Sequence, residues 1–289
     1  PIRIGEIAHD FRYEASGAIK GIERGRHFCQ NDAHLFVTPE QIKDEFKNVV
    51  DLIFGVYKDF DIKNYRCVLS LRDPKDKEKY HQDDAMWNKA ENELREVLND
   101  LGIEYTEEIG EAAFYGPKLD VNVQPAVGNE YTLSTCQLDF CLPAKFDLKD
   151  GEKKTPVVLH RAILGSLDRF MAYILEETKG QLPTWLSPVQ VKVIPVNPEF
   201  QGEYAKEVTE MLKENDIRAE LDDRNEKLGY RLREAQTEKV PFTLILGDQE
   251  KENATISYRL FGQKDTTTVS KEEFIKLIKE EIINKTIRK

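Results

Sequence analysis

Residues 11–36 read FRYEASGAIKGIERGRHFCQNDAHLF and hold more polar side chains than a buried hairpin could accommodate. Arg12 and Glu14 are two residues apart, so on a strand they point to the same face. Gly17 and Gly21 mark a loop. A returning strand then places alternate residues on one face, namely Phe28, Gln30, Asp32 and His34. Arginine can grip a phosphate and a carboxylate can accept from an amine, so this face indicates a nucleotide and amine site; a charged, solvated hairpin face is the alternative.

Beyond the hairpin, the chain mixes helix and strand signals without regular alternation up to about residue 186. Residues 40–60 and 83–101 carry apolar side chains at helical spacing. Period-two alternation, typical of strands, occurs at residues 65–73, 118–127 and 132–140. Runs of strands with segregated helices predict an α+β domain built on an antiparallel sheet.

The pattern changes at Pro183 and Pro188, which flank a turn. Strands are then predicted at 189–196, 217–223, 240–248 and 255–261, with helices at 200–215, 225–239 and 270–284. Strands that alternate with helices of this length imply βαβ units in a mixed, largely parallel sheet. We therefore predict two domains, residues 1–186 and 187–289.

The composition excludes several classes of protein. Of the 289 residues, 40% are hydrophobic and 33% charged, as in a chain that buries sizeable cores. No apolar run reaches the length of a bilayer span, and the start of the chain does not resemble a signal peptide. The four cysteines form no CxxC pair and read as reduced thiols of a cytosolic protein. A net charge of -11 argues against non-specific nucleic-acid binding but not against a specific RNA partner.

Several stretches resemble one family, in order along the chain. Residues 11–36 begin with Phe-Arg-x-Glu and continue with a loop, an arginine and a phenylalanine, which resembles motif 2 of the class II aminoacyl-tRNA synthetases. The wording RYEASGAIKGIERGR is similar to the threonyl-tRNA synthetases in particular. The same family is resembled by AAFYGPKLD (112–120), STCQLDF (134–140), PVVLHRAILGSLDRF (156–170), PTWLSPVQV (183–191), DDRNEKLGYRLREAQ (222–236) and VPFTLILGD (240–248). The resemblance implies a class II catalytic domain followed by an anticodon-binding domain.

The resemblance also implies an ATP site. Arg12 would hold the α-phosphate, and Arg169, within the motif 3 segment LGSLDRF (164–170), would be the second catalytic arginine. Arg24 would meet the γ-phosphate, Phe28 would stack on adenine, and Glu14 would lie near the adenine or the tRNA acceptor end. Mg²⁺ would accompany the ATP. Fixed cations suit this chemistry, because charge develops on the phosphate during attack by a carboxylate.

A zinc site is implied beside it. In this family one cysteine and two histidines hold a zinc that contacts the threonine amino and hydroxyl groups, and His34 and His160 match the two histidines. Taken alone, each is more often a structural histidine than a metal ligand. The threonine pocket would be lined by Asp32, which faces the ammonium, and by Tyr115, Gln137 and Ser166. A metal that demands a hydroxyl rejects valine, which has the same shape but no hydroxyl.

In the second domain, the resemblance makes Asn225, Lys227, Glu250 and Arg259 candidates for reading anticodon bases. Unpaired loop bases are read by stacking and by hydrogen bonds to their edges, which suits these side chains. A solvated helix face is the alternative for the basic residues between Arg224 and Lys239.

The implied activity is that of a threonine–tRNA ligase, with ATP, threonine and the threonine tRNA as partners and no membrane or DNA partner. The full-length enzyme would be a cytoplasmic homodimer. The family's cysteine ligand and motif 1 lie before motif 2, so we expect both upstream of Pro1, and we expect this chain by itself to hold zinc weakly. The alternative is a truncated paralogue that binds tRNA or a regulatory RNA without aminoacylating.

Overall fold

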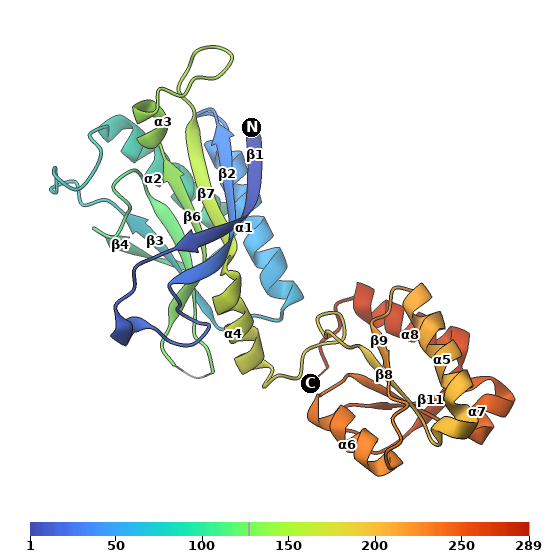
Figure 1. Ribbon diagram of the computed structural model, residues 1–289. Coiled ribbons are helices and arrows are strands. Elements are labelled where there is room, and N and C mark those ends of the chain that lie inside the picture. The colour runs from blue at the N-terminus through green and yellow to red at the C-terminus, as the bar shows by residue number, and fades with distance from the viewer. Residues whose placement is uncertain (127, 289) are drawn as a thin grey trace. The chain divides into compact units, whose positions relative to one another are not determined.

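The computed structural model describes residues 1–126 and 128–288, and it divides into two compact units, Pro1–Glu177 and Thr178–Lys289 (Figure 1). The division falls somewhat earlier than the predicted boundary at residues 186 and 187, because the turn that contains Pro183 packs with the second unit. Residues 127 and 289, which end the predicted strand at 118–127 and the second predicted domain, lie outside the described residues.

The first unit is built on a seven-stranded sheet. Its strands follow one another in the order β1 (Ile2–Phe11), β2 (His27–Val37), β7 (Val157–Ser166), β6 (Tyr131–Asp139), β5 (Lys118–Val123), β3 (Tyr65–Leu71) and β4 (Tyr105–Ile109). Every pairing is antiparallel except that of β3 with β4. The predicted α+β domain with an antiparallel sheet is therefore confirmed.

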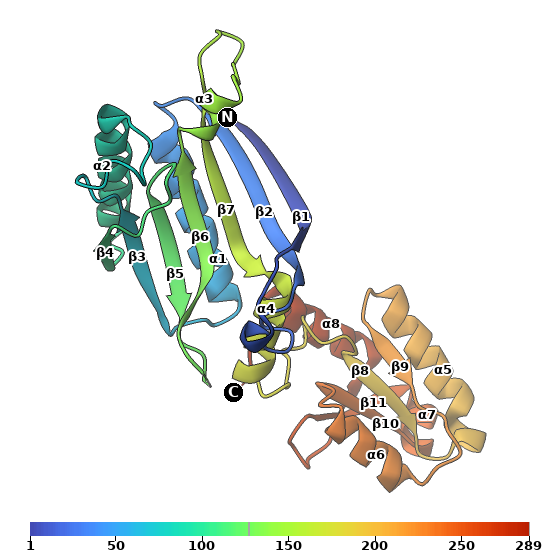
Figure 2. The same cartoon turned by 60° about the vertical axis from the view of Figure 1, so that its left-hand side comes forward.

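Two helices, α1 (Ile42–Asp59) and α2 (Asp84–Asp100), pack together and cover one face of this sheet (Figure 2). Phe46 and Ile53 of α1 and Trp87 and Leu94 of α2 are fully buried there. Each such side chain contributes roughly 1.5–3 kcal/mol on burial. The opposite face carries polar side chains and holds the candidate site described below. Three short elements complete the unit: η1 (Ser16–Ala18), α3 (Leu142–Lys145) and α4 (Leu167–Glu177).

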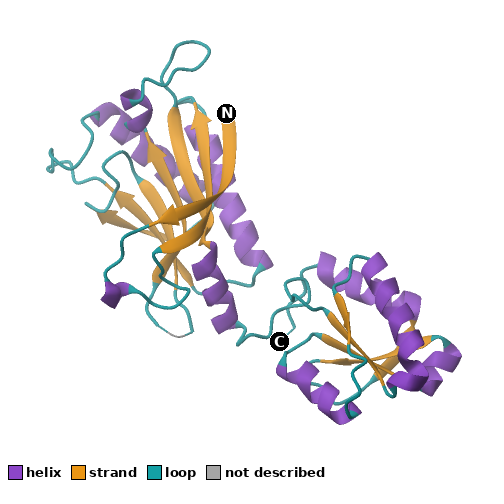
Figure 3. Ribbon diagram, in the orientation of Figure 1, coloured by secondary structure: helices purple, strands orange, loops and turns teal. Residues whose placement is uncertain are grey.

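The second unit is a five-stranded mixed sheet flanked by helices (Figure 3). Its strand order is β12 (Thr267–Ser270), β11 (Thr255–Leu260), β10 (Phe242–Leu246), β8 (Val191–Pro195) and β9 (Ala219–Leu221). The β10–β8 and β8–β9 pairings are parallel, and the β10–β11 and β11–β12 pairings are antiparallel. The predicted βαβ units and mixed sheet are confirmed.

The helices of this unit are α5 (Pro198–Glu214), α6 (Leu228–Thr237), α7 (Asp248–Asn253) and α8 (Lys271–Ile283). Helices α5 and α8 share a core with the central strands, in which Val208, Phe242 and Phe274 are fully buried. Across residues 1–126 and 128–288, no helix is both long and apolar enough to traverse a bilayer.

Candidate functional site

The loop of the β1–β2 hairpin brings four of the predicted ATP-site residues together. The guanidinium carbon of Arg12 lies 5.4 Å from the centroid of the Phe28 ring. Nε of Arg24 lies 3.2 Å from carboxylate Oε2 of Glu14, which is buried although Arg24 is exposed. The backbone N–H of Arg12 donates to the carbonyl of Arg26 at 2.9 Å and closes the base of the loop. Arginines beside an aromatic ring are suited to a phosphate and a stacked base.

Arg169, on α4, reaches the same loop from another part of the chain. Its Nε donates to the backbone carbonyl of Glu23 at 3.2 Å. Its backbone N–H donates to Oγ of Ser166 at 3.3 Å, which ties the first turn of α4 to the end of β7. The predicted phosphate arginines, Arg12, Arg24 and Arg169, therefore all lie on or against the hairpin loop.

Gly165, near the end of β7, bends the chain so that α4 runs toward the loop of the β1–β2 hairpin. Gly165 has a φ of +59°, and a Cβ there would lie 2.5 Å from the carbonyl oxygen of Leu133. Only glycine fits both the left-handed backbone and the close approach. The β2–β7 register shifts at this point, so that Ser166 stands opposite Gln30, whereas Ala162 stands opposite Asp32. Bulges of this kind re-aim side chains beside active sites.

Three predicted residues form one row across β2, β7 and β6. These strands lie next to one another in the sheet (Figure 2). His34 on β2 is directly opposite His160 on β7, and His160 is directly opposite Gln137 on β6. The two imidazole ring centroids are 4.7 Å apart and the rings are nearly perpendicular. In the next row, Asp32 lies opposite Ala162. Because alternate residues share a face, these polar side chains stand together on the sheet face opposite α1 and α2.

The predicted threonine-pocket residues are partly engaged with one another. The hydroxyl of Tyr115 donates to Oε1 of Gln137. Burial raises the pKa of Tyr115, so this hydroxyl stays protonated at neutral pH. Oδ1 of Asp32 accepts from the backbone N–H of Ala33 at 2.9 Å, and its half-buried carboxylate is next to His34. Oγ of Ser166 lies 3.5 Å from Asp168 Oδ2, at the end of the same strand as His160.

The histidine pair fits part of a zinc site. Imidazole nitrogens bind zinc at about 2.0–2.1 Å, and two facing rings can supply two such nitrogens. Cys29 is opposite His9 in the β1–β2 register. It is an odd number of residues from His34 on the same strand, so its side chain lies on the sheet face opposite to that of His34. Among residues 1–126 and 128–288, no group of three or more His, Cys, Asp or Glu side chains is arranged to hold a metal.

Two carboxylates of this face were not among the predicted residues. Oδ2 of Asp139 lies 3.1 Å from Nε2 of His160, and Oδ1 of Asp120 accepts from Oγ1 of Thr135 at 2.7 Å. The signal that could have found Asp139 is its spacing, since it is two residues after Gln137 on the same strand and shares its face.

In the second unit, Asn225 and Lys227 are exposed in the turn that leads into α6. Arg259 on β11 is directly opposite Thr243 on β10. Nε of Arg259 and Oγ1 of Thr243 are both buried, and within the described residues neither has a hydrogen-bond partner. A buried polar atom without a partner costs about 1–3 kcal/mol.

The fourth predicted anticodon residue, Glu250, already makes local contacts. Its Oε2 accepts from the backbone N–H of Gly247 at 2.8 Å, and its Oε1 accepts from Oγ of Ser257 at 2.6 Å. Burial works to raise its pKa, but these hydrogen bonds hold the pKa of Glu250 below its usual value. Both carboxylate oxygens thus help to shape the turn before α7.

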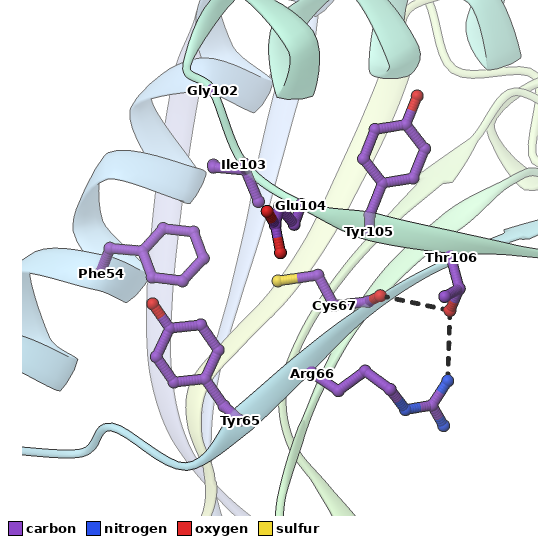
Figure 4. A pocket seen from close by; sticks show the side chains of 9 residues that line it. All are labelled: Phe54, Tyr65, Arg66, Cys67, Gly102, Ile103, Glu104, Tyr105 and Thr106. Carbon is purple, nitrogen blue, oxygen red and sulfur yellow. Dashed lines mark hydrogen bonds between the residues drawn. The ribbon is translucent and has the colours of Figure 1, made fainter.

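A separate hollow of about 540 Å³ lies at the starts of β3 and β4 (Figure 4). It is lined by Phe54, Tyr65, Arg66, Cys67, Gly102, Ile103, Glu104, Tyr105 and Thr106. Burial raises the pKa of Cys67 to about 11, so its thiol is a poor nucleophile. None of the predicted site residues lines this hollow.

Two family models match the chain. The tRNA synthetase class II core domain (G, H, P, S and T) matches residues 1–178, and the anticodon binding domain matches residues 190–281. Together with the antiparallel sheet and its polar face, these matches define a class II aminoacyl-tRNA synthetase. The threonine–tRNA ligase of Staphylococcus carnosus is 54% identical over 286 residues, which are 98% of this chain and 44% of that protein. The chain belongs to the threonyl-tRNA synthetase family.

Solved structures agree with this assignment. The RNA-binding domain of threonyl-tRNA synthetase from Cryptosporidium parvum is 33% identical with a TM-score of 0.89, over 97% of this chain and 70% of that one. A threonyl-tRNA synthetase from Aeropyrum pernix is 27% identical with a TM-score of 0.85, over 99% of this chain and 69% of that one. The chain spans less than half the length of the curated relatives that it matches.

Proposed function

We propose that the protein is a threonine–tRNA ligase, which activates threonine with ATP to threonyl-adenylate and then transfers the threonyl group to its tRNA. One observation carries this proposal: His34, His160 and Gln137 form one row beside Asp32, on a sheet face bounded by a loop that gathers three arginines. One edge of the face thus suits an amino acid with a side-chain hydroxyl, and the other suits a triphosphate.

In the first half-reaction, a threonine carboxylate oxygen attacks the α-phosphorus of ATP, and the bond from that phosphorus to the bridging oxygen of pyrophosphate breaks. Arg12 and Arg169 neutralise the charge that develops on the α-phosphate oxygens. Phe28 stacks on the adenine, and Arg24 exchanges its partner Glu14 for the γ-phosphate when ATP binds. Mg²⁺ bound to the ATP would offset the charge of the leaving pyrophosphate.

The amino acid is recognised on the sheet face. His34 and His160 would hold a zinc, together with a third ligand from outside the described residues. When bound, the zinc would supply a Lewis acid for recognition of the amino and hydroxyl groups of threonine. Asp32 accepts from the ammonium. Gln137, held by Tyr115, and Ser166 complete the pocket and fix the side chain of the substrate. Valine, which lacks the hydroxyl, would leave these polar groups unpaired.

The second unit would bind the anticodon. Arg259, which is partly exposed, and the exposed Asn225 and Lys227 supply donors for base edges. Glu250 would contribute by shaping the adjacent turn, with both of its oxygens already engaged. We also propose that the full-length protein is a cytoplasmic homodimer, as the family resemblance implies.

ATP–pyrophosphate exchange tests the proposal directly. The full-length protein, supplied with zinc and Mg²⁺, should catalyse exchange that depends on threonine and is not supported by valine. Exchange that is absent with threonine, although the protein binds tRNA, would instead support the non-catalytic RNA-binding alternative.

A further inference from the structure

Asp139 is a buried aspartate, and both of its carboxylate oxygens contact other groups of the protein. It ends β6, with only 1% of its surface exposed. Its Oδ1 accepts from the backbone N–H groups of Cys141 at 2.9 Å and Leu142 at 2.8 Å, at the start of α3. Its Oδ2 lies 3.1 Å from Nε2 of His160. The aspartate is therefore held in place from one side and contacts the histidine from the other.

The chemistry of this contact determines which nitrogen of His160 carries the proton. An ionised carboxylate only accepts hydrogen bonds, so Nε2 of His160 must be the donor. In the neutral ring, Nδ1 then has the free lone pair. Within the described residues, Nδ1 of His160 has no hydrogen-bond partner.

His34, the other histidine of the pair, is not fixed in the same way. Its Nδ1 lies 3.8 Å from Oδ2 of Asp32, beyond the distance of a hydrogen bond. The side chain of Asp32 is 23% exposed, whereas Asp139 is buried. His160 thus has a carboxylate at hydrogen-bonding distance, whereas the carboxylate beside His34 is too far away for such a bond.

We propose that Asp139 is a positioning residue that fixes His160 in the Nε2–H tautomer and leaves Nδ1 to bind the metal. The metal-binding part of this proposal rests on the proposed function. The tautomer of His160 depends only on its contact with Asp139 in this chain. Carboxylates that hold ligating histidines in this way typically change metal affinity 10–100-fold.

The substitution Asp139→Asn is the sharpest test, because it nearly preserves shape. The amide oxygen of asparagine can still accept from Cys141 and Leu142. Its NH₂ group then faces His160 and can only donate, so Nε2 must become the acceptor and the proton must move to Nδ1. Asp32→Asn, beside His34, is the matched control.

The readout is the ring ¹⁵N spectrum of this chain at about pH 8.5, where an ordinary histidine is neutral. The chain has five histidines, and His160→Gln identifies the signal of His160. We expect the Nε2–H form in the wild type and in Asp32→Asn, and the Nδ1–H form in Asp139→Asn. A wild-type His160 in the Nδ1–H form would overturn the proposal by itself, even if Asp139→Asn failed to fold.

A second measurement connects the tautomer to the metal. In the full-length protein, competition with a chelator should show that Asp139→Asn loosens zinc about 10–100-fold, whereas Asp32→Asn changes it less. Equal zinc affinity in the wild type and Asp139→Asn would overturn the positioning role. A wild-type protein that binds no zinc would instead refute the proposed function, and the tautomer result would still stand.

Discussion

Oε2 of Glu14 lies 3.2 Å from Nε of Arg24, so the arginine expected at the γ-phosphate is paired with a buried carboxylate. The side chain of Arg24 is nevertheless about half exposed, at 51%, so that a phosphate can reach it. The loop therefore holds Arg24 where a triphosphate can reach it, and Arg24 at the same time pairs with the buried carboxylate of Glu14.

Arg24→Ala should raise the KM for ATP about tenfold or more, since a charge-assisted hydrogen bond contributes roughly 1.5–3 kcal/mol. The measurement is ATP–pyrophosphate exchange in the full-length protein. Lys20→Ala is the control, because Lys20 pairs with Glu23 in the same loop. An equal rise of the KM for ATP in both variants would mean that the loss of any positive charge in the loop weakens ATP binding, and that Arg24 has no specific contact with the γ-phosphate.

Arg12→Ala and Arg169→Ala should each lower the kcat of exchange by about a hundredfold or more while threonine binding survives. The reason is that each would contact developing charge on the phosphate, at roughly 3 kcal/mol per lost contact. Arg66→Ala, which removes an ion pair between β3 and Glu130 in the loop before β6, should exchange normally. Near-normal kcat in either test variant would remove that arginine from the catalytic role.

Removal of zinc by a chelator should abolish threonine-dependent exchange, and added zinc should restore it. His34→Ala and His160→Ala should each weaken zinc binding roughly a hundredfold, because about 10–16 kcal/mol of zinc binding is shared among few ligands. The control is His9→Gln, a histidine on the opposite face of β1 that contacts His27. Zinc retained in both test variants would show that other residues hold it.

Asn225→Ala and Arg259→Ala should weaken charging of the tRNA by about 1–3 kcal/mol each, by analogy with base readout, and leave adenylate formation unchanged. The measurement compares kcat/KM for tRNA with the exchange rate. Lys206→Ala, an exposed lysine of α5 paired with Glu203, provides the control. Unchanged tRNA kinetics in both test variants would place the anticodon elsewhere.

The Arg3–Glu45 ion pair predicts a pH dependence of stability. A hydrogen bond from Arg3, opposed by burial, lowers the pKa of Glu45. A lowered folded-state pKa stabilises the protein above the unfolded value, about 4.3, and this contribution is lost as the pH falls through the folded pKa. Arg3→Ala should therefore lower the free energy of unfolding at pH 7. Urea titrations at about pH 3 should show a smaller difference between the variant and the wild type.

Strong periodicity made the larger elements predictable. The helix expected at residues 40–60 is α1 (Ile42–Asp59), because Phe46 and Ile53 recur on one apolar face. Strand β4, with the sequence YTEEI, was missed, since it has little apolar alternation and depends on its pairing with β3. Helix α7, with the sequence DQEKEN, buries no residue and carries no periodic signal at all.

For the site, the sequence predicted which residues share one face of a strand, but not which strands lie next to each other in the sheet. Alternation placed Asp32 and His34 on one side of their strand, and the family resemblance supplied His160. Which strands adjoin β7 depends on the whole sheet, so the contact between Asp139 and His160 could not be predicted from local patterns. The ion pair of Glu14 with Arg24 likewise depends on how the loop closes.

The long separation in sequence between β2 and β7 affects how the protein folds during translation. Asn31 and Arg161, on these two paired strands, are 130 residues apart. At about 5–20 residues per second, the ribosome releases the second strand roughly 6–26 s after the first. During that interval β2 can pair with β1 but not with β7, so one edge of the nascent hairpin stays open to other chains. Translation speed across residues 37–157 should therefore influence the yield of native protein more than translation speed in the hairpin itself.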